Sequence, residues 1–174
     1  MTSLKVSPPV LWIAGLGALS GLLSSLEPEA LKHFKALGVP IYPGPLFGLV
    51  IAFGVYRWGK ASWWAAILVL VVTVAAWIAA VRGFLGVTDN ATSNIYLGGF
   101  VAGAIGAAGT MLGGAIIIPV LRGSPDWLLT IGVGAVAGLL IVPAERMPED
   151  YLLLLFVVWQ AAVAACIGYA LTRR

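Results

Sequence analysis

The sequence predicts an all-α protein: a polytopic membrane bundle of six transmembrane helices in a single integral membrane domain, residues 1–174. Hydrophobic residues make up 61% of the chain and charged residues only 10%, which leaves too little polar surface to cover a water-soluble particle. The charged residues gather between long apolar runs, as expected at helix ends and in loops. The small net charge of +3 is therefore a matter of membrane topology, and binding to nucleic acid is not expected.

Six apolar runs approach the roughly 20 residues that a helix needs to cross a hydrocarbon core. The first run could be mistaken for a signal peptide, but a single basic residue, Lys5, precedes it and glutamates follow it, so we interpret it as a membrane helix. The second run is the shortest, and Pro40, Pro43 and Pro45 favour a helix start in the headgroup region. The predicted helices cover residues 9–26, 43–58, 61–84, 95–121, 127–143 and 151–171.

Basic residues decide the predicted orientation, because Lys and Arg are retained on the cytoplasmic side. With the N terminus inside, the cytoplasmic basic residues are Lys5, Arg57, Lys60, Arg122, Arg173 and Arg174. The external ones are then Lys32, Lys35, Arg82 and Arg146. Six crossings place both termini in the cytoplasm. Most tryptophans fall at the predicted cytoplasmic ends and most tyrosines at the outer ends, which is typical of interfacial aromatic belts.

An internal repeat is a further candidate feature. Residues 7–23 align without gaps to residues 124–140, and both copies begin with Ser-Pro. The glycines coincide as well: Gly15, Gly17 and Gly21 match Gly132, Gly134 and Gly138. Because four spans separate the first and fifth helices, they point the same way and would form a parallel repeat. The alternative is a chance alignment of two helices rich in Gly, Ala and Leu.

Small residues three or four positions apart mark most of the predicted helices and allow helix backbones to approach closely in lipid. The fourth helix has the most, so we expect it at the centre of the bundle, and the third, rich in Val, Ala, Leu and Trp, at the lipid-facing rim. Close packing is the favoured interpretation, and the alternative is a crevice lined by backbone. The candidate crevice or packing residues are Gly17, Gly21, Gly99, Gly103, Gly106, Thr110, Gly134, Gly138 and Gln160.

No ionisable residue falls at mid-membrane depth in this prediction, where such groups usually mark ion paths, proton relays or catalytic centres. A proton-coupled pump is therefore disfavoured. The deepest polar residues are Ser20, Thr73, Thr110, Thr130 and Gln160. Serine and threonine in membrane helices usually bond their own backbone carbonyls, so Gln160 is the predicted contact between helices.

Motifs for catalysis or metal binding are absent from the sequence. With His33 as the only histidine and Cys166 as the only cysteine, neither an HExxH site, a Cys/His zinc set nor an intrachain disulfide can form. His33 with Lys32 and Lys35 makes a small basic patch, which we interpret as a face that touches lipid headgroups. We expect no catalytic, cofactor-binding or metal-binding residues and no cofactor, and we do not expect an enzyme.

Two functions remain open at this point. The first is a transport or substrate-binding component for a small neutral or apolar solute, with a crevice around the first, fourth and fifth helices. The alternative is a non-catalytic accessory or structural subunit of a larger membrane complex. The expected partners are membrane lipids and either other membrane chains or further copies of the protein, and the expected location is the cell membrane, specifically a bacterial inner membrane.

Overall fold

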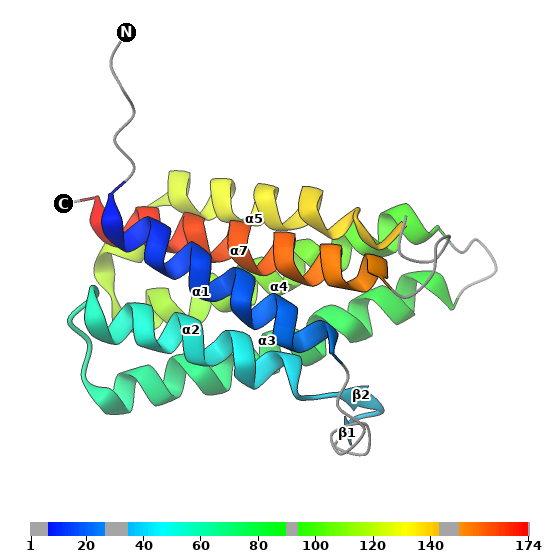
Figure 1. Ribbon diagram of the computed structural model, residues 1–174, viewed down its shortest axis with the longest axis horizontal. Helices are drawn as coiled ribbons and strands as arrows, with labels where there is room; N and C mark the ends of the chain where they lie inside the picture. The colour runs from blue at the N-terminus through cyan, green and yellow to red at the C-terminus, as the bar shows by residue number, and fades with distance from the viewer. Residues whose placement is uncertain (1–6, 27–34, 90–93, 143–149, 174) are drawn as a thin grey trace, which may run out of the picture.

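The computed structural model describes residues 7–26, 35–89, 94–142 and 150–173, without the side chains of residues 150 and 151. The described part is all-α, as predicted, with six α-helices, one 3-10 turn and a minimal two-stranded hairpin (Figure 1). In chain order the elements are α1 Pro8–Ser25, β1 Lys35–Ala36, β2 Val39–Pro40, α2 Pro43–Arg57, α3 Trp63–Thr88, α4 Ile95–Ile117, η2 Pro119–Arg122, α5 Ser124–Gly138 and α7 Asp150–Thr172.

Four of these helices are long and apolar enough to cross a membrane: α1, α3, α4 and residues Leu152–Thr172 of α7. The chain is thus a multi-pass membrane protein. The other two helices, α2 and α5, have 15 residues each, which is short of the roughly 17–25 that a span across the full hydrocarbon core uses.

Three predicted helices have different boundaries in the structure. The fifth runs from Ser124 to Gly138 instead of over residues 127–143, because Pro125 fits its first turn and the helix ends at the C-cap Leu139. The fourth helix was expected to run to residue 121, but it ends at Ile117 because Pro119 follows. Ile118, the residue before that proline, is extended (φ −109°, ψ 108°), as the ring of a following proline requires. The third helix runs to Thr88 instead of residue 84, and Ser62 caps its start by accepting a hydrogen bond from the backbone N–H of Ala65.

The six helices form a closed circuit in which each packs against its neighbours in the chain and α7 closes the circuit on α1. Neighbouring helices are antiparallel and run along the long axis of the molecule (Figure 1). The start of α1 meets the end of α7, where the Ser7 hydroxyl lies 3.5 Å from that of Thr172. We call this end of the bundle the closed end, and the other end, where β1 and β2 lie, the hairpin end.

The fourth helix does not occupy the centre of the bundle as expected. Of the four spans it has the largest share of buried residues, 44% of its 18-residue apolar window, and α3 has the smallest, 22%. Helix α3 therefore has the exposed position predicted for it. A central helix would pack against all the others, whereas α4 packs chiefly against α3 and α5 and has no substantial contact with α1. Most of its glycines serve close contacts with these two neighbours.

Aliphatic side chains fill the half of the bundle near the closed end. Every helix except α5 contributes to this core, and η2 adds Leu121 from the turn after α4. The fully buried members include Ile13, Val55, Met111, Leu121 and Ile167. We call this part of the bundle the filled half.

Two side-chain hydrogen bonds hold the hairpin and the start of α2, which directly follows it, against α1 and α3. The Tyr42 hydroxyl donates to the Ser24 carbonyl at 3.0 Å, and the Trp77 indole N–H donates to the Pro40 carbonyl at 2.7 Å. Its turn uses Leu37 and Gly38, both with positive φ, a pair of conformations typical of two-residue hairpin loops. The hairpin therefore has a fixed position against α1 and α3.

Candidate functional site

A cavity of about 180 Å³ lies inside the helix circuit, in the half of the bundle near the hairpin end. Its lining comes from α2, α3, α4, α5 and α7 and from Ile141 just beyond α5. None of the described residues that line it is charged, and most are Ala, Gly, Leu or aromatic residues. We call this part of the bundle the hollow half.

Aromatic rings form the walls of the cavity. Phe47 on α2 packs against Trp159 on α7, with ring centroids 5.5 Å apart, and Trp77 on α3 packs against Phe156 on α7 at 5.7 Å. The indole N–H of Trp159 donates to the Gly134 carbonyl at 3.1 Å, as that of Trp77 donates to Pro40. These bonds fix both indoles, so the walls are in place before any ligand binds.

The non-aromatic polar residues of the lining lie together at its deepest level. Thr73, Thr110 and Gln160 are the lining residues of α3, α4 and α7 that lie farthest from the hairpin end along each helix. The Thr73 hydroxyl donates to the Val69 carbonyl and the Thr110 hydroxyl to the Gly106 carbonyl, both at 2.8 Å. This is the local backbone bonding expected of threonine in membrane helices.

Gln160 makes the contact between helices that its position suggested. Its amide nitrogen donates to the hydroxyl oxygen of Ser24 on α1 at 3.1 Å, and the residue is only 2% exposed. Its amide oxygen, Oε1, is buried and has no hydrogen-bond partner within the described residues. The other buried side-chain atom without a partner there, the Ser20 hydroxyl oxygen, belongs to a residue that does not line the cavity.

The structure separates the nine candidate residues into two groups. Those that line the cavity are Gly99, Gly103, Gly106, Thr110, Gly138 and Gln160. Gly17, Gly21 and Gly134 do not line it and instead lie where two helices cross closely. Because α1 contributes nothing to the lining, the cavity is surrounded by α2, α3, α4, α5 and α7 and not by the first, fourth and fifth helices.

Two glycine seams hold the helices at these crossings. On α1, a Cβ at Gly17 would lie 2.7 Å from the Gln160 carbonyl oxygen, and one at Gly21 would overlap the backbone of Phe156. Between α4 and α5, Gly103 faces the Gly134 carbonyl and Gly99 faces that of Gly138. The obstructing atoms are backbone, so a larger residue could not be accommodated by a change of rotamer.

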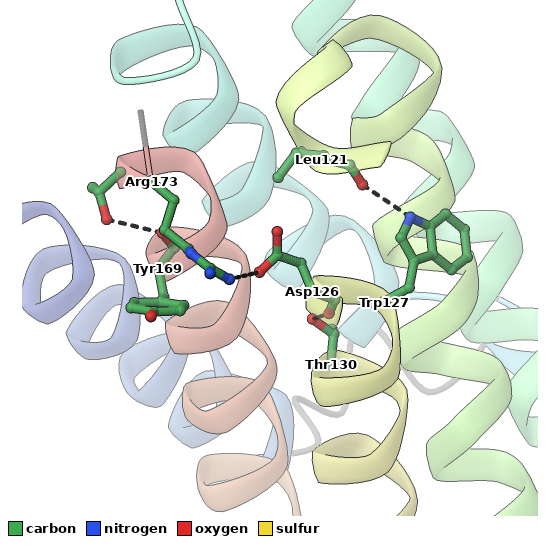
Figure 2. Close-up of polar contacts among 7 residues, drawn as sticks. Leu121, Asp126, Trp127, Thr130, Tyr169 and Arg173 are labelled. Atoms are coloured by element: carbon green, nitrogen blue, oxygen red, sulfur yellow. Dashed lines mark hydrogen bonds and ion pairs between the residues drawn. The ribbon is translucent and has the colours of Figure 1, made fainter. Parts of the chain in front are cut away.

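A polar cluster joins α5 and α7 at the closed end (Figure 2). The Arg173 guanidinium contacts the Asp126 carboxylate at 3.0 Å and lies over the Tyr169 ring, 5.3 Å from its centroid. Asp126 lies in the first turn of α5 and Arg173 just after the end of α7, so each charge is also stabilised by the dipole of its helix. The sequence analysis placed Arg173 on the cytoplasmic side but did not pair it with Asp126.

The turn after α4 is fixed by further hydrogen bonds at this end. The Arg122 side chain donates to the Ala115 carbonyl at 2.9 Å and to the Ile116 carbonyl at 3.1 Å, which satisfies the last carbonyls of α4. The Trp127 indole N–H donates to the Leu121 carbonyl at 2.9 Å (Figure 2). These contacts stabilise the closed end and contain no nucleophile paired with a base.

Other candidate chemistry finds little support. Across residues 7–26, 35–89, 94–142 and 150–173, no three His, Cys, Asp or Glu residues are grouped so as to hold a metal ion. Lys32 and His33 of the proposed basic patch lie outside the described residues, and Lys35 is exposed at the start of β1.

Comparisons of the chain with protein-family models, with curated proteins and with solved structures found no match.

Proposed function

We propose that this chain is a six-span membrane protein that binds a small neutral or apolar solute in its cavity and serves as a transport or substrate-binding component. The observation that carries the proposal is the uncharged, aromatic-walled cavity inside the helix circuit. An apolar protein cavity of about 150 Å³ is large enough to hold benzene, so this cavity suits a molecule with one ring or of similar size. The proposal assigns the chain no catalytic role and no cofactor.

The six-span arrangement is supported by the circuit itself. Helices α2 and α5 each lie between two longer helices and run antiparallel to them, so short spans at these positions complete the bundle. The meeting of Ser7 with Thr172 supports an even number of crossings. Gly17 and Gly21 meet α7 as their counterparts Gly134 and Gly138 meet α4, which supports the parallel repeat.

The proposed orientation places the closed end in the cytoplasm of a bacterial inner membrane. Four described basic residues lie at or beside that end: Arg57, Lys60, Arg122 and Arg173. Basic residues are enriched on the cytoplasmic side of membrane proteins. The hollow half then faces the outside of the cell, and the filled half separates the cavity from the cytoplasm. A transporter would have to open the filled half, whereas a substrate-binding subunit would not.

The experiment that tests the function is purification from the native membrane in mild detergent, with mass spectrometry of the proteins and small molecules that co-elute. We expect a small neutral molecule bound to the chain, and an increase in its melting temperature when that molecule is added back. A stoichiometric protein partner with no bound small molecule would instead indicate an accessory subunit and contradict the proposal.

Cysteine labelling tests the topology separately. In a Cys166→Ala background, Lys35→Cys and Lys60→Cys should react with an impermeant maleimide from opposite sides of the membrane, because α2 lies between these exposed residues. Labelling of both from the same side would show that α2 does not cross, and would rule out the six-span arrangement.

A further inference from the structure

The arrangement of hydrogen-bonding groups around the cavity narrows the class of ligand. This inference rests on the proposed function, since it concerns the same cavity. Five lining residues carry polar side-chain groups: Thr73, Trp77, Thr110, Trp159 and Gln160. What each can offer a ligand depends on where its hydrogen atoms already point.

The hydroxyl and indole donors are already used. Trp77 and Trp159 donate their indole hydrogens to Pro40 and Gly134, and an indole has no acceptor to offer instead. The hydroxyl hydrogens of Thr73 and Thr110 point to carbonyls of their own helices. Each threonine oxygen keeps lone pairs and can still accept a hydrogen bond.

Gln160 adds a further free acceptor to the cavity lining, whose threonine side chains can accept hydrogen bonds but have no free donor. One of its amide hydrogens is donated to Ser24, while Oε1 lacks any partner in the described part of the chain and is buried. Leaving such an acceptor unsatisfied costs about 1–3 kcal/mol, which a ligand that donates to it would recover. Membrane interiors offer little water to do the same.

We infer that the ligand is a neutral, largely apolar molecule with a ring or a similarly compact body and one hydrogen-bond donor, such as a hydroxyl group, that binds Gln160 Oε1. Its apolar body lies between the walls formed by Phe47, Trp77, Phe156 and Trp159. Its donor lies at the deep level where Thr73, Thr110 and Gln160 meet the cavity. A ligand that carries only acceptors could bond to just one free donor among the five polar side chains, the second amide hydrogen of Gln160.

The test compares p-cresol with anisole, which are isomers of the same composition, so that p-cresol has a hydroxyl donor and anisole only an ether acceptor. Toluene serves as the apolar reference. Binding is measured in the full-length protein in detergent, from the increase in melting temperature with ligand concentration. We expect p-cresol to bind about tenfold more tightly than anisole, as one additional hydrogen bond to a buried acceptor predicts. The exposed-residue variant Leu128→Ala is the control and should give the same ratio.

Two variants locate the donor preference. Gln160→Leu removes the acceptor and should abolish the difference between p-cresol and anisole, while Ser24→Ala leaves Oε1 in place and should preserve it. A preference that survives in Gln160→Leu, or that is lost in Ser24→Ala, would overturn the inference. The comparison in the unaltered protein tests it even if Gln160→Leu does not fold.

The remaining outcomes separate this inference from the proposed function. If toluene, anisole and p-cresol all stabilise the unaltered protein equally, the cavity binds apolar solutes as proposed, but the donor requirement is wrong. If none of them stabilises the protein at concentrations that leave Leu128→Ala and the unaltered protein folded, both the inference and the proposed binding of small apolar solutes are wrong.

Discussion

The two halves of the bundle are built from the same six helices but are held together in different ways. In the filled half, aliphatic side chains such as Met111, Leu121 and Ile167 meet in a continuous core. In the hollow half, backbones touch at the Gly99–Gly138 and Gly103–Gly134 crossings, and aromatic rings hold the opposite wall apart. Close packing at the seam and wide spacing across the cavity therefore occur at the same depth, and this difference is what leaves space for a ligand.

The largest expected effect is at the seam of the hollow half. Gly103→Ala would place a methyl group on the carbonyl of Gly134 and 3.0 Å from the Cα of Gly138, so α4 and α5 would have to separate. We expect a loss of at least about 3 kcal/mol, the upper part of the range for overpacking, measured as a lower melting temperature in detergent. Gly132→Ala on α5, where nothing lies within 4 Å of the added methyl group, is the control and should be neutral or slightly stabilising. Equal melting temperatures for the two variants would contradict the seam.

The filled half should respond to loss of volume. Leu121 is fully buried, so Leu121→Ala should leave a void and cost about 2–4 kcal/mol. Leu128, seven positions later, is 74% exposed, and Leu128→Ala should change stability by less than about 0.5 kcal/mol. Chemical or thermal unfolding of both variants in one detergent measures the difference. A small effect at Leu121 would show that this end is less tightly packed than described.

Truncation of a large apolar side chain to alanine should cost less stability in the hollow half. Phe84 lines the cavity and is only half-buried, so Phe84→Ala removes more atoms than Leu121→Ala but enlarges a space that already exists. We expect a loss of about 1–2 kcal/mol, compared with about 3–5 kcal/mol for a phenylalanine in a filled core. If Phe84→Ala proved more damaging than Leu121→Ala, the distinction between the two halves would fail.

The smallest effect concerns the ion pair of the closed end. Arg173 is half-exposed, so Arg173→Gln should cost about 0.5–1 kcal/mol, and less at high salt. A double-mutant cycle with Asp126→Asn measures the coupling between the two side chains. Additive effects of the two substitutions would mean that the pair contributes nothing beyond its separate contacts.

Much of the fold was readable from local patterns. Long apolar runs located each of the six described helices, and prolines at positions 43 and 45 marked the start of α2. Pro119 ends α4, but the prediction extended the helix to residue 121 because the apolar run continues through Leu121. The rule that the residue before proline leaves the helix was the better guide at this position.

The cavity was less predictable, because it depends on contacts between helices distant in the chain. Gly17 and Gly21 have the same spacing as Gly99 and Gly103, yet the first pair lies against α7 away from the cavity and the second pair lines it. Spacing shows that a helix face permits close approach, but it does not identify the partner. Gln160 was identifiable because a buried amide in a membrane needs a partner, and half of that need is met by Ser24.

The closure of the circuit by α1 and α7 also constrains how the protein is made. Helices inserted one after another can pair with the preceding helix at once, but α1 must wait for its most extensive contact until α7 is in the membrane. Until then the seam at Gly17 and Gly21 has no partner within the chain. Helix α1 therefore completes its packing only after α7 has been synthesised, and any factor that assists biogenesis would find its binding surface on that seam.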